Sequence, residues 1–275
     1  MVLRQDHTPQ GGIIIGSLDL NTLKPPNLAA SIFYGGSMKR VAILIDGQNL
    51  YYNLQNIGLI EKNIKWNDLF HSWIVGGEDE LTRTYWFRPQ KILDSYFTSE
   101  NIRSNIVFKD YRIHHPNYKD NKANIPADII AEIERKATIA EDWLKQEKTK
   151  FSKIEYNYDQ LCFEHGDIEF VKTGIVKVNP YIQEYIGEKG VDISLAVKMI
   201  SLSVDNRVDK IILVSGDFDY SEAIKFVKNR MTKIHLVKIH KGYPPQNRSV
   251  SRDLAVLADR VIDVYESDVR SKYLK

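Results

Sequence analysis

The sequence predicts an α/β fold: a doubly wound, mostly parallel sheet of about five strands with a helical insertion. Two apolar runs, residues 41–45 and 211–214, are typical of strands buried on both faces of such a sheet. Each run ends in a turn that contains aspartate and leads into a segment with helical spacing. A long amphipathic segment lies between the two runs and accounts for the insertion.

The first apolar run and a later helix each place an acid at the end of an element. The run 41–45 ends in Asp46, and the Gly-Gln-Asn sequence that follows brings Asn49 to the start of a helix. Asp192 lies in the first turn of an apolar helix. Asn49 would face the same cleft as Asp46, either orienting a carboxylate or phosphate or simply capping the helix.

The stretch 211–220 is predicted to be the centre of the chain's chemistry. Its apolar strand ends in a Ser-Gly turn, followed by Asp217 and Asp219. Asp219 and Glu222 fit a capping box for a helix at 221–228. Both aspartates would lie at the carboxyl end of a buried strand, where open α/β sheets bind ligands. Taken alone, the pair could equally be a turn residue and an N-cap.

The predicted topology brings these acids together. In a doubly wound sheet the two apolar strands would be neighbours, which places Asp46 beside Asp217. Clustered carboxylates repel one another, so a fold that gathers them normally neutralises them with a cation. Oxygen ligands without cysteine or histidine favour Mg²⁺ or Mn²⁺.

The spacing of apolar residues predicts the remaining elements of the sheet. Residues 66–75 fit a helix, 83–87 a strand and 106–111 a further strand. Residues 169–178 have strand character and would return the chain to the sheet. Residues 233–239 fit the strand that follows the central stretch.

The clearest helix runs from Pro126 to Lys150. Its apolar side chains recur at spacings of three and four, and charged side chains cover the other face. With residues 151–164 it forms a helical insertion at about 120–165. The insertion could form a lid, a surface for homo-oligomer formation or simple packing, and the sequence does not decide among these.

Length and composition set the outer limits. A chain of 275 residues allows one large domain with an insertion, and 43% hydrophobic with 27% charged residues is ordinary for a globular protein. A single cysteine, Cys162, excludes an internal disulfide framework and cysteine-based zinc sites. No run approaches about 18 apolar residues, so we expect no transmembrane helix, no membrane partner and a cytoplasmic location.

The two ends of the chain differ from the domain between them. Residues 1–37 end in a segment rich in proline and glycine, and we expect an extension or leader that packs poorly. The alternative is an arm that binds a partner. The domain itself is expected at 38–265, followed by a C-terminal tail at 266–275.

Three motifs carry a resemblance to a known family. They are Ile-Asp-Gly-Gln-Asn-Leu from residue 45, Lys-Gly-Val-Asp-Ile-Ser-Leu-Ala-Val from residue 189 and Val-Ser-Gly-Asp-Phe-Asp-Tyr from residue 214. In this order they closely resemble the NYN domain family, the LabA-like branch of the PIN-like nucleases. Ala258–Asp263 also resembles the last helix of that family. The resemblance covers roughly residues 38–265 and implies a PIN-like, Rossmannoid fold.

The resemblance implies a metal-dependent ribonuclease that hydrolyses RNA phosphodiester bonds. The implied catalytic residues are Asp46, Asn49, Asp192, Asp217 and Asp219. The four aspartates would hold one or two Mg²⁺ or Mn²⁺ ions. Many members carry a further acid where this chain has Lys198. Because that position lies about 120° around the helix from Asp192, we expect Lys198 to face away from the site.

A basic segment is the candidate surface for RNA, either single-stranded or structured. Between Lys225 and Arg252 the chain has eight lysines and arginines and no acidic residue. A basic stretch with an aromatic residue beside an acidic metal site suits a bound polyanion. The alternative is a set of solvated helix and strand faces. The candidate RNA-binding residues are Lys225, Lys241, Tyr243, Arg248 and Arg252.

Two other functions are compatible with parts of the sequence. A non-catalytic RNA-binding or regulatory module would keep the NYN fold with a weakened site, and Lys198 is its best support. A phosphatase of the haloacid dehalogenase type would need a second aspartate two residues after Asp46. That position is Gln48, which argues strongly against this chemistry.

Overall fold

The computed structural model describes residues 38–93, 126–247 and 249–275. The chain divides into two units, residues 1–37 and 38–275, and the described residues all belong to the second. Three sequence predictions fall outside the described residues: the extension at 1–37, the strand at 106–111, and Arg248 as an RNA-binding residue.

Six strands form one sheet in the order β4-β2-β1-β7-β8-β9, and every pairing is parallel. The chain starts at the central strand β1, moves outward to β4, and returns to the centre at β7 before building the other edge. The doubly wound, mostly parallel sheet is therefore confirmed, with six strands instead of about five. The strands are β1 (Arg40–Asp46), β2 (Glu80–Arg88), β4 (Ile168–Lys172), β7 (Lys210–Val214), β8 (Lys233–His240) and β9 (Arg260–Tyr265).

The prediction of a last helix at Ala258–Asp263 is wrong, because this stretch leads into the edge strand β9. Ile262 and Val264 of β9 are buried, while Asp263 between them is exposed. This period of two, with β-branched residues on the inner face, is typical of a strand packed on one side. The helix comes afterwards, as α9, within the predicted C-terminal tail.

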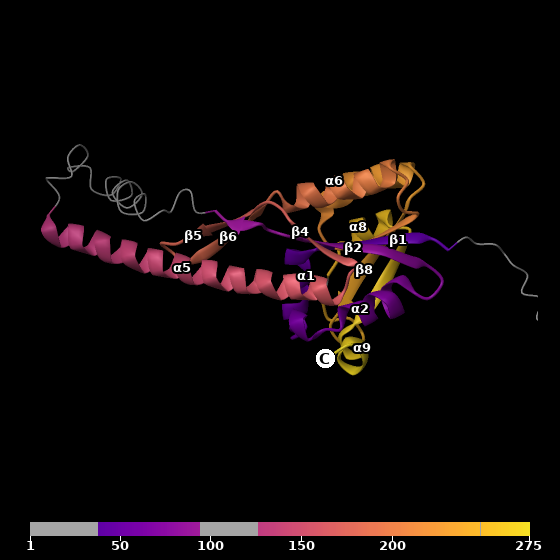
Figure 1. Cartoon of the computed structure of the whole chain (residues 1–275), viewed down its shortest axis with the longest axis horizontal. Coiled ribbons are helices and arrows are strands. Elements are labelled where there is room, and N and C mark those ends of the chain that lie inside the picture. Colours follow the sequence, from indigo (N-terminus) through magenta and orange to yellow (C-terminus); the bar gives the residue numbers. More distant parts are fainter. Residues whose placement is uncertain (1–37, 94–125, 248) are drawn as a thin grey trace, which may run out of the picture. The chain divides into compact units, whose positions relative to one another are not determined.

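Helices cover both faces of the sheet, as Figure 1 shows with α6 on one side and α1, α2 and α9 on the other. Alternate residues of β1 enter the two cores, so Ile43 packs under α1 and Leu44 under α6. The predicted helix at 66–75 is confirmed as α2 with the π-helical turn η2. The helical elements are α1 (Gly47–Asn56), η1 (Glu61–Asn63), α2 (Trp66–Leu69), η2 (Phe70–Val75), α6 (Val191–Val204), η6 (Phe218–Tyr220), α7 (Ser221–Asn229), α8 (Arg252–Leu257) and α9 (Glu266–Lys272).

The predicted insertion is one continuous helix, α5 (Ala127–Glu164). Its stripe is confirmed, since Ile133, Ala137, Ala140 and Leu144 are buried. Leu144 packs against a small sheet of β3 (Lys91–Ile92), β5 (Ile175–Asn179) and β6 (Glu184–Lys189). The predicted strand at 169–178 is thus two strands, β4 in the main sheet and β5 in this one.

No helix within the described ranges is long and apolar enough to cross a membrane.

Candidate functional site

Asp46 is the last residue of β1, and its side chain is almost completely buried. Its Oδ1 accepts a hydrogen bond from the backbone N–H of Asn49 (3.0 Å), which caps α1, and its Oδ2 accepts one from the hydroxyl of Ser215 (3.0 Å). Burial raises the pKa of the Asp46 carboxyl, while these hydrogen bonds oppose the rise. Asp46 is therefore a rigidly placed carboxylate at the carboxyl end of the sheet.

The phenol of Tyr220 joins Asp46 to Asp192. Its oxygen lies 3.3 Å from Oδ2 of Asp46 and 3.2 Å from Oδ1 of Asp192. Asp192 lies in the first turn of α6, as predicted, and its side chain is exposed. Burial, followed by the two carboxylates, raises the pKa of the Tyr220 phenol, so its proton is firmly held. Two of the predicted acids are thus within reach of one donor.

Asn49 ties the start of α1 to the end of β7. Its side-chain oxygen accepts hydrogen bonds from the backbone N–H of Gly216 (3.1 Å) and the amide of Asn53 (2.8 Å). Gly216 must be glycine here, because a Cβ would lie 1.9 Å from the carbonyl oxygen of Ser249. Asn49 therefore positions the turn that follows β7.

Asp217 and Asp219 follow on that turn and have local partners. The backbone N–H of Asp217 donates to Ser215 (3.2 Å), and its carboxylate accepts from the backbone N–H of Asp219 (3.0 Å), capping η6. Asp219 itself is exposed within η6, and α7 begins after Tyr220 without a side-chain cap. The predicted capping box of Asp219 with Glu222 is therefore wrong. The short 3₁₀ turn moves the cap position back to Asp217.

Glu188 is an acid of this site that the sequence analysis missed. It lies on β6, beside the insertion, and its pKa is raised to about 7 by burial and by Asp46 and Asp192, with Arg88 opposing the rise. Ser215 and Tyr220 were also missed as site residues, although both stand inside the third motif. For Glu188 the only sequence signal was its place four residues before Asp192, next to the second motif.

The donors around Asp46 suit a hard cation in their chemistry. Asp46, Asp192 and Glu188 are carboxylates that interact electrostatically, and carboxylate oxygens are the ligands that hard cations prefer. Within the described ranges, however, no three acidic, histidine or cysteine side chains stand close enough together to hold a metal ion. The structure therefore pairs Asp46 with Asp192, and Asp217 and Asp219 do not join them in one ligand cluster.

Lys198 packs away from the paired acids. Its ammonium lies 4.1 Å from the ring centre of Tyr85 in β2, a cation–π contact. Tyr85 pairs with Leu44, two residues before Asp46 on β1. This placement agrees with the expectation that Lys198 faces a different direction from Asp192.

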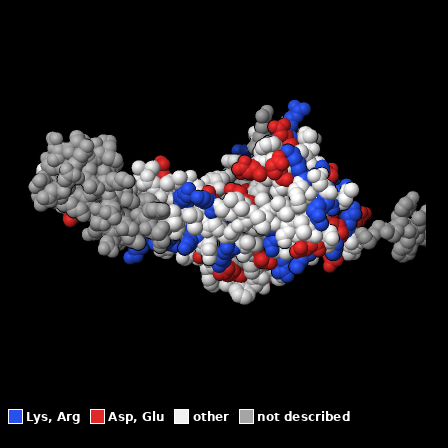
Figure 2. Space-filling view, turned by 90° about the horizontal axis from the view of Figure 1, so that it is seen from above, with Lys and Arg blue, Asp and Glu red and all other residues white. Residues whose placement is uncertain are grey.

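In the structure, acidic residues from outside the basic segment 225–252 neutralise part of its positive charge. Lys225 pairs with Glu222 (2.7 Å), and Lys228 pairs with Asp259 (3.3 Å). On the face shown in Figure 2, acidic and basic side chains are interspersed. Tyr243 is 86% exposed, and Lys241 is also exposed, in the loop after β8.

A groove of about 980 Å³ brings part of this segment to Asn49 and the turn after β7. Its lining includes Asn49, Tyr52, Gly216, Lys238 and Arg252. Arg252 is therefore the predicted RNA-binding residue that the structure places beside a predicted catalytic residue.

Comparison with known proteins identifies one family. The model of the NYN domain matches residues 40–267. No curated protein matches the chain. A crystal structure of a protein of unknown function from Vibrio parahaemolyticus is similar, with 18% sequence identity and a TM-score of 0.43, over 86% of this chain and 97% of that one.

Proposed function

Since the chain belongs to the NYN domain family, we propose that it is a ribonuclease that hydrolyses RNA phosphodiester bonds with the help of Mg²⁺ or Mn²⁺. The observation that carries this proposal is the pairing of Asp46 with Asp192 through Tyr220 at the carboxyl end of β1. Open parallel α/β sheets bind their ligands at the carboxyl ends of their strands. Two carboxylates, one of them buried, form an anionic centre that a divalent cation would stabilise.

Asp46, Asp192, Asp217 and Asp219 would hold the ion. The chemistry that the ion supplies when bound is activation of the attacking water and neutralisation of charge on the phosphate. Binding would require Asp192, which is exposed, and the turn after β7 to adjust, because Asp46 is held by three hydrogen bonds. Glu188 adds a further carboxylate within electrostatic range of Asp46 and Asp192.

The chain's own residues have distinct tasks in this proposal. Tyr220 orients Asp46 and Asp192 and holds its proton between them. Asn49 fixes the turn after β7 through its hydrogen bond from Gly216. It thereby keeps Asp217, which follows Gly216, at a constant position relative to β1. Ser215 links the two, because it donates to Asp46 and accepts from the backbone of Asp217. Hydrogen bonds of this kind, made to the ligands by residues that do not bind the ion, keep the ligating side chains oriented.

RNA would approach along the groove beside Asn49. Lys238 and Arg252 line this groove, and Lys241 and Tyr243 lie on the loop that follows the same strand, β8. Cations attract the phosphates, and an exposed aromatic ring can stack on a base. We include Lys225 as a weaker contributor, because Glu222 already pairs with it.

A second candidate is a non-catalytic RNA-binding module with the same fold. The observation that favours it is that, within the described residues, no three potential ligands gather around one point. Such a module would bind RNA with the same groove but would not need the carboxylates.

Incubation of purified protein with labelled RNAs separates the two candidates. We expect cleavage that stops in EDTA and returns with Mn²⁺. Asp192→Asn should abolish cleavage without changing the fold, because the side chain is exposed, and Asp205→Asn at the C-cap of the same helix is the matched control. RNA binding without cleavage in Mn²⁺ would favour the non-catalytic module.

A further inference from the structure

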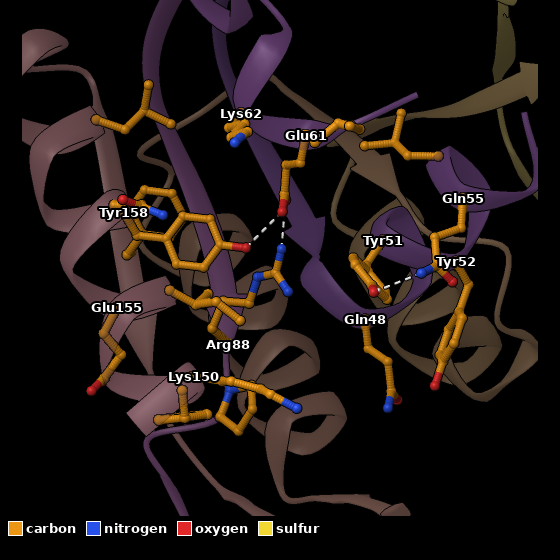
Figure 3. A pocket seen from close by; sticks show the side chains of 18 of the residues that line it. Gln48, Tyr51, Tyr52, Gln55, Glu61, Lys62, Arg88, Lys150, Glu155 and Tyr158 are labelled. Carbon is orange, nitrogen blue, oxygen red and sulfur yellow. Dashed lines mark hydrogen bonds and ion pairs between the residues drawn. The ribbon is translucent and has the colours of Figure 1, made fainter. Parts of the chain in front are cut away.

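A second hollow lies beside α1, is lined by residues of α1, α5 and β6, and shares Tyr52 with the Arg252 groove. Its volume is about 1030 Å³, at the upper end of the range for small-ligand sites. Figure 3 shows Tyr51, Tyr52 and Gln48 of α1 on one side and Arg88 and Tyr158 on the other. We call this hollow the tyrosine cavity.

The tyrosine cavity presents aromatic rings to solvent. Tyr51 and Tyr52 are 43% and 54% exposed, and their rings meet edge to face at 5.7 Å. Tyr185 of β6 is 54% exposed and also lines the cavity. Three partly exposed tyrosines around one hollow give it an aromatic surface, which is the feature that base-stacking surfaces share.

The walls of the tyrosine cavity are held in place by hydrogen bonds and ion pairs. Glu61 accepts from Arg88 (2.5 Å) and from the hydroxyl of Tyr158 (2.6 Å), and the Arg88 guanidinium lies over the Tyr158 ring at 4.6 Å. Glu147 pairs with Lys150 (2.5 Å) and accepts from Tyr185. Glu61 and Glu147 are thus paired with cations, so these two acids repel an incoming RNA strand less than free carboxylates would.

The tyrosine cavity opens next to the acids of the candidate site. Gln48, two residues after Asp46, lines it, and so does Glu188, which interacts electrostatically with Asp46 and Asp192. Tyr52 lines both the tyrosine cavity and the Arg252 groove. A strand that follows the groove past Asn49 therefore reaches the cavity within a short distance of the paired acids.

We propose that the tyrosine cavity binds an unpaired nucleobase of the RNA strand, stacked on Tyr51 or Tyr52, beside the phosphodiester at the acidic site. The position of the base relative to cleavage rests on the proposed ribonuclease function. A base inside a cavity cannot pair with another strand, so the substrate class is single-stranded or looped RNA. Continuity with the acids favours RNA over a peptide, which would have no reason to reach Gln48 and Glu188.

The test measures binding in EDTA, where cleavage is stopped. The probe is a single-stranded RNA of about ten nucleotides, within the usual site sizes of single-strand binding domains, carrying 2-aminopurine to report stacking. Replacing both tyrosines, Tyr51→Ala with Tyr52→Ala, should weaken binding roughly ten- to a hundredfold and abolish the fluorescence change. The double change to phenylalanine should retain both, because it keeps the rings.

Tyr156→Ala is the matched control, since Tyr156 is 62% exposed on α5 but does not line the tyrosine cavity. Unchanged affinity in the double alanine variant would overturn the inference while leaving any Mn²⁺-dependent cleavage intact. An equal loss of affinity for a duplex of the same sequence would overturn it too. Weakened binding together with no cleavage by the native protein would support the cavity and reject the ribonuclease.

Discussion

Tyr220 places one phenol oxygen 3.3 Å from Oδ2 of Asp46 and 3.2 Å from Oδ1 of Asp192, so a single proton serves two carboxylates. A phenol has one hydrogen to donate, and it cannot satisfy both acceptors fully at once. The pair is therefore held together in the metal-free protein but retains capacity for another positive partner.

Tyr220→Phe should destabilise the metal-free protein by about 1–3 kcal/mol, because the buried acceptor on Asp46 loses a donor and the two acids lose their shared proton. Thermal melting in EDTA checks this. Mn²⁺ should restore more stability to the variant than to the native protein, since the cation replaces the missing charge compensation. Tyr243→Phe is the control, because its side chain is 86% exposed. If Tyr220→Phe and the native protein melt at the same temperature in EDTA, Tyr220 does not bridge the two acids as described.

Two substitutions of Asp217 distinguish its structural role as a cap from a catalytic role. Asp217→Asn keeps the side-chain oxygen that accepts from Asp219, so its stability should stay near that of the native protein, whereas Asp217→Ala should lose about 1 kcal/mol with the cap. If Asp217 also binds the ion, both variants should lose cleavage to a similar extent. Melting curves and cleavage rates measured side by side make the distinction. Full cleavage by Asp217→Asn would remove this residue from the proposed ligand set.

Glu188→Gln should change how stability depends on pH. The folded protein raises the pKa of Glu188 from 4.5 to about 7. Below pH 4.5 both folded and unfolded forms hold the proton, and between 4.5 and 7 only the folded form does, so stability falls as pH rises through this window. The full shift overstates the effect because Glu188 is partly solvated, and we expect a loss of about 1–2 kcal/mol.

The glutamine variant cannot titrate at this position, so it should lose less stability between pH 5 and pH 8. Chemical unfolding in EDTA at both pH values gives the comparison. EDTA is needed because a bound cation would favour the ionised carboxylate. The same pH slope in the two proteins would show that Glu188 titrates normally.

Removing positive charge at Lys241 and Arg252 should weaken RNA binding and flatten its salt dependence. Each phosphate contact that is lost lowers the slope of log affinity against log salt by about 0.7 for a single strand. Lys225→Gln is the matched comparison, because Glu222 already pairs with Lys225 at 2.7 Å. Binding titrations across a salt series measure all three slopes. A larger change from Lys225→Gln than from Arg252→Gln would mean that RNA runs over α7 instead of the Arg252 groove.

The parts of the fold that could be predicted are those with a strong local pattern. Continuous apolar runs predicted β1 and β7, and the three- and four-residue spacing predicted α5. The helix predicted at Ala258–Asp263 is wrong because the prediction rested on the match to a family motif alone. The β-branched residues Val261, Ile262 and Val264 were the sequence feature that favoured a strand there.

Some residues of the candidate site could likewise be predicted from the sequence, and others could not. Asp46 and Asp192 could be predicted because each stands where a strand ends or a helix begins, and these ends converge in a parallel sheet. Glu188 was missed because it approaches Asp46, which is far away in the sequence, only in the folded chain, and no local pattern indicates this.

The sequence by itself thus determined which elements form and which acids stand at their ends, since both follow from neighbours a few residues apart. Only the tertiary structure decided that Tyr220 would bridge Asp46 and Asp192, that Asp217 would cap its own turn, and that α1 and α5 would enclose the tyrosine cavity. These contacts join residues far apart in the chain. Their geometry depends on how both cores pack against the sheet, which is a property of the whole domain.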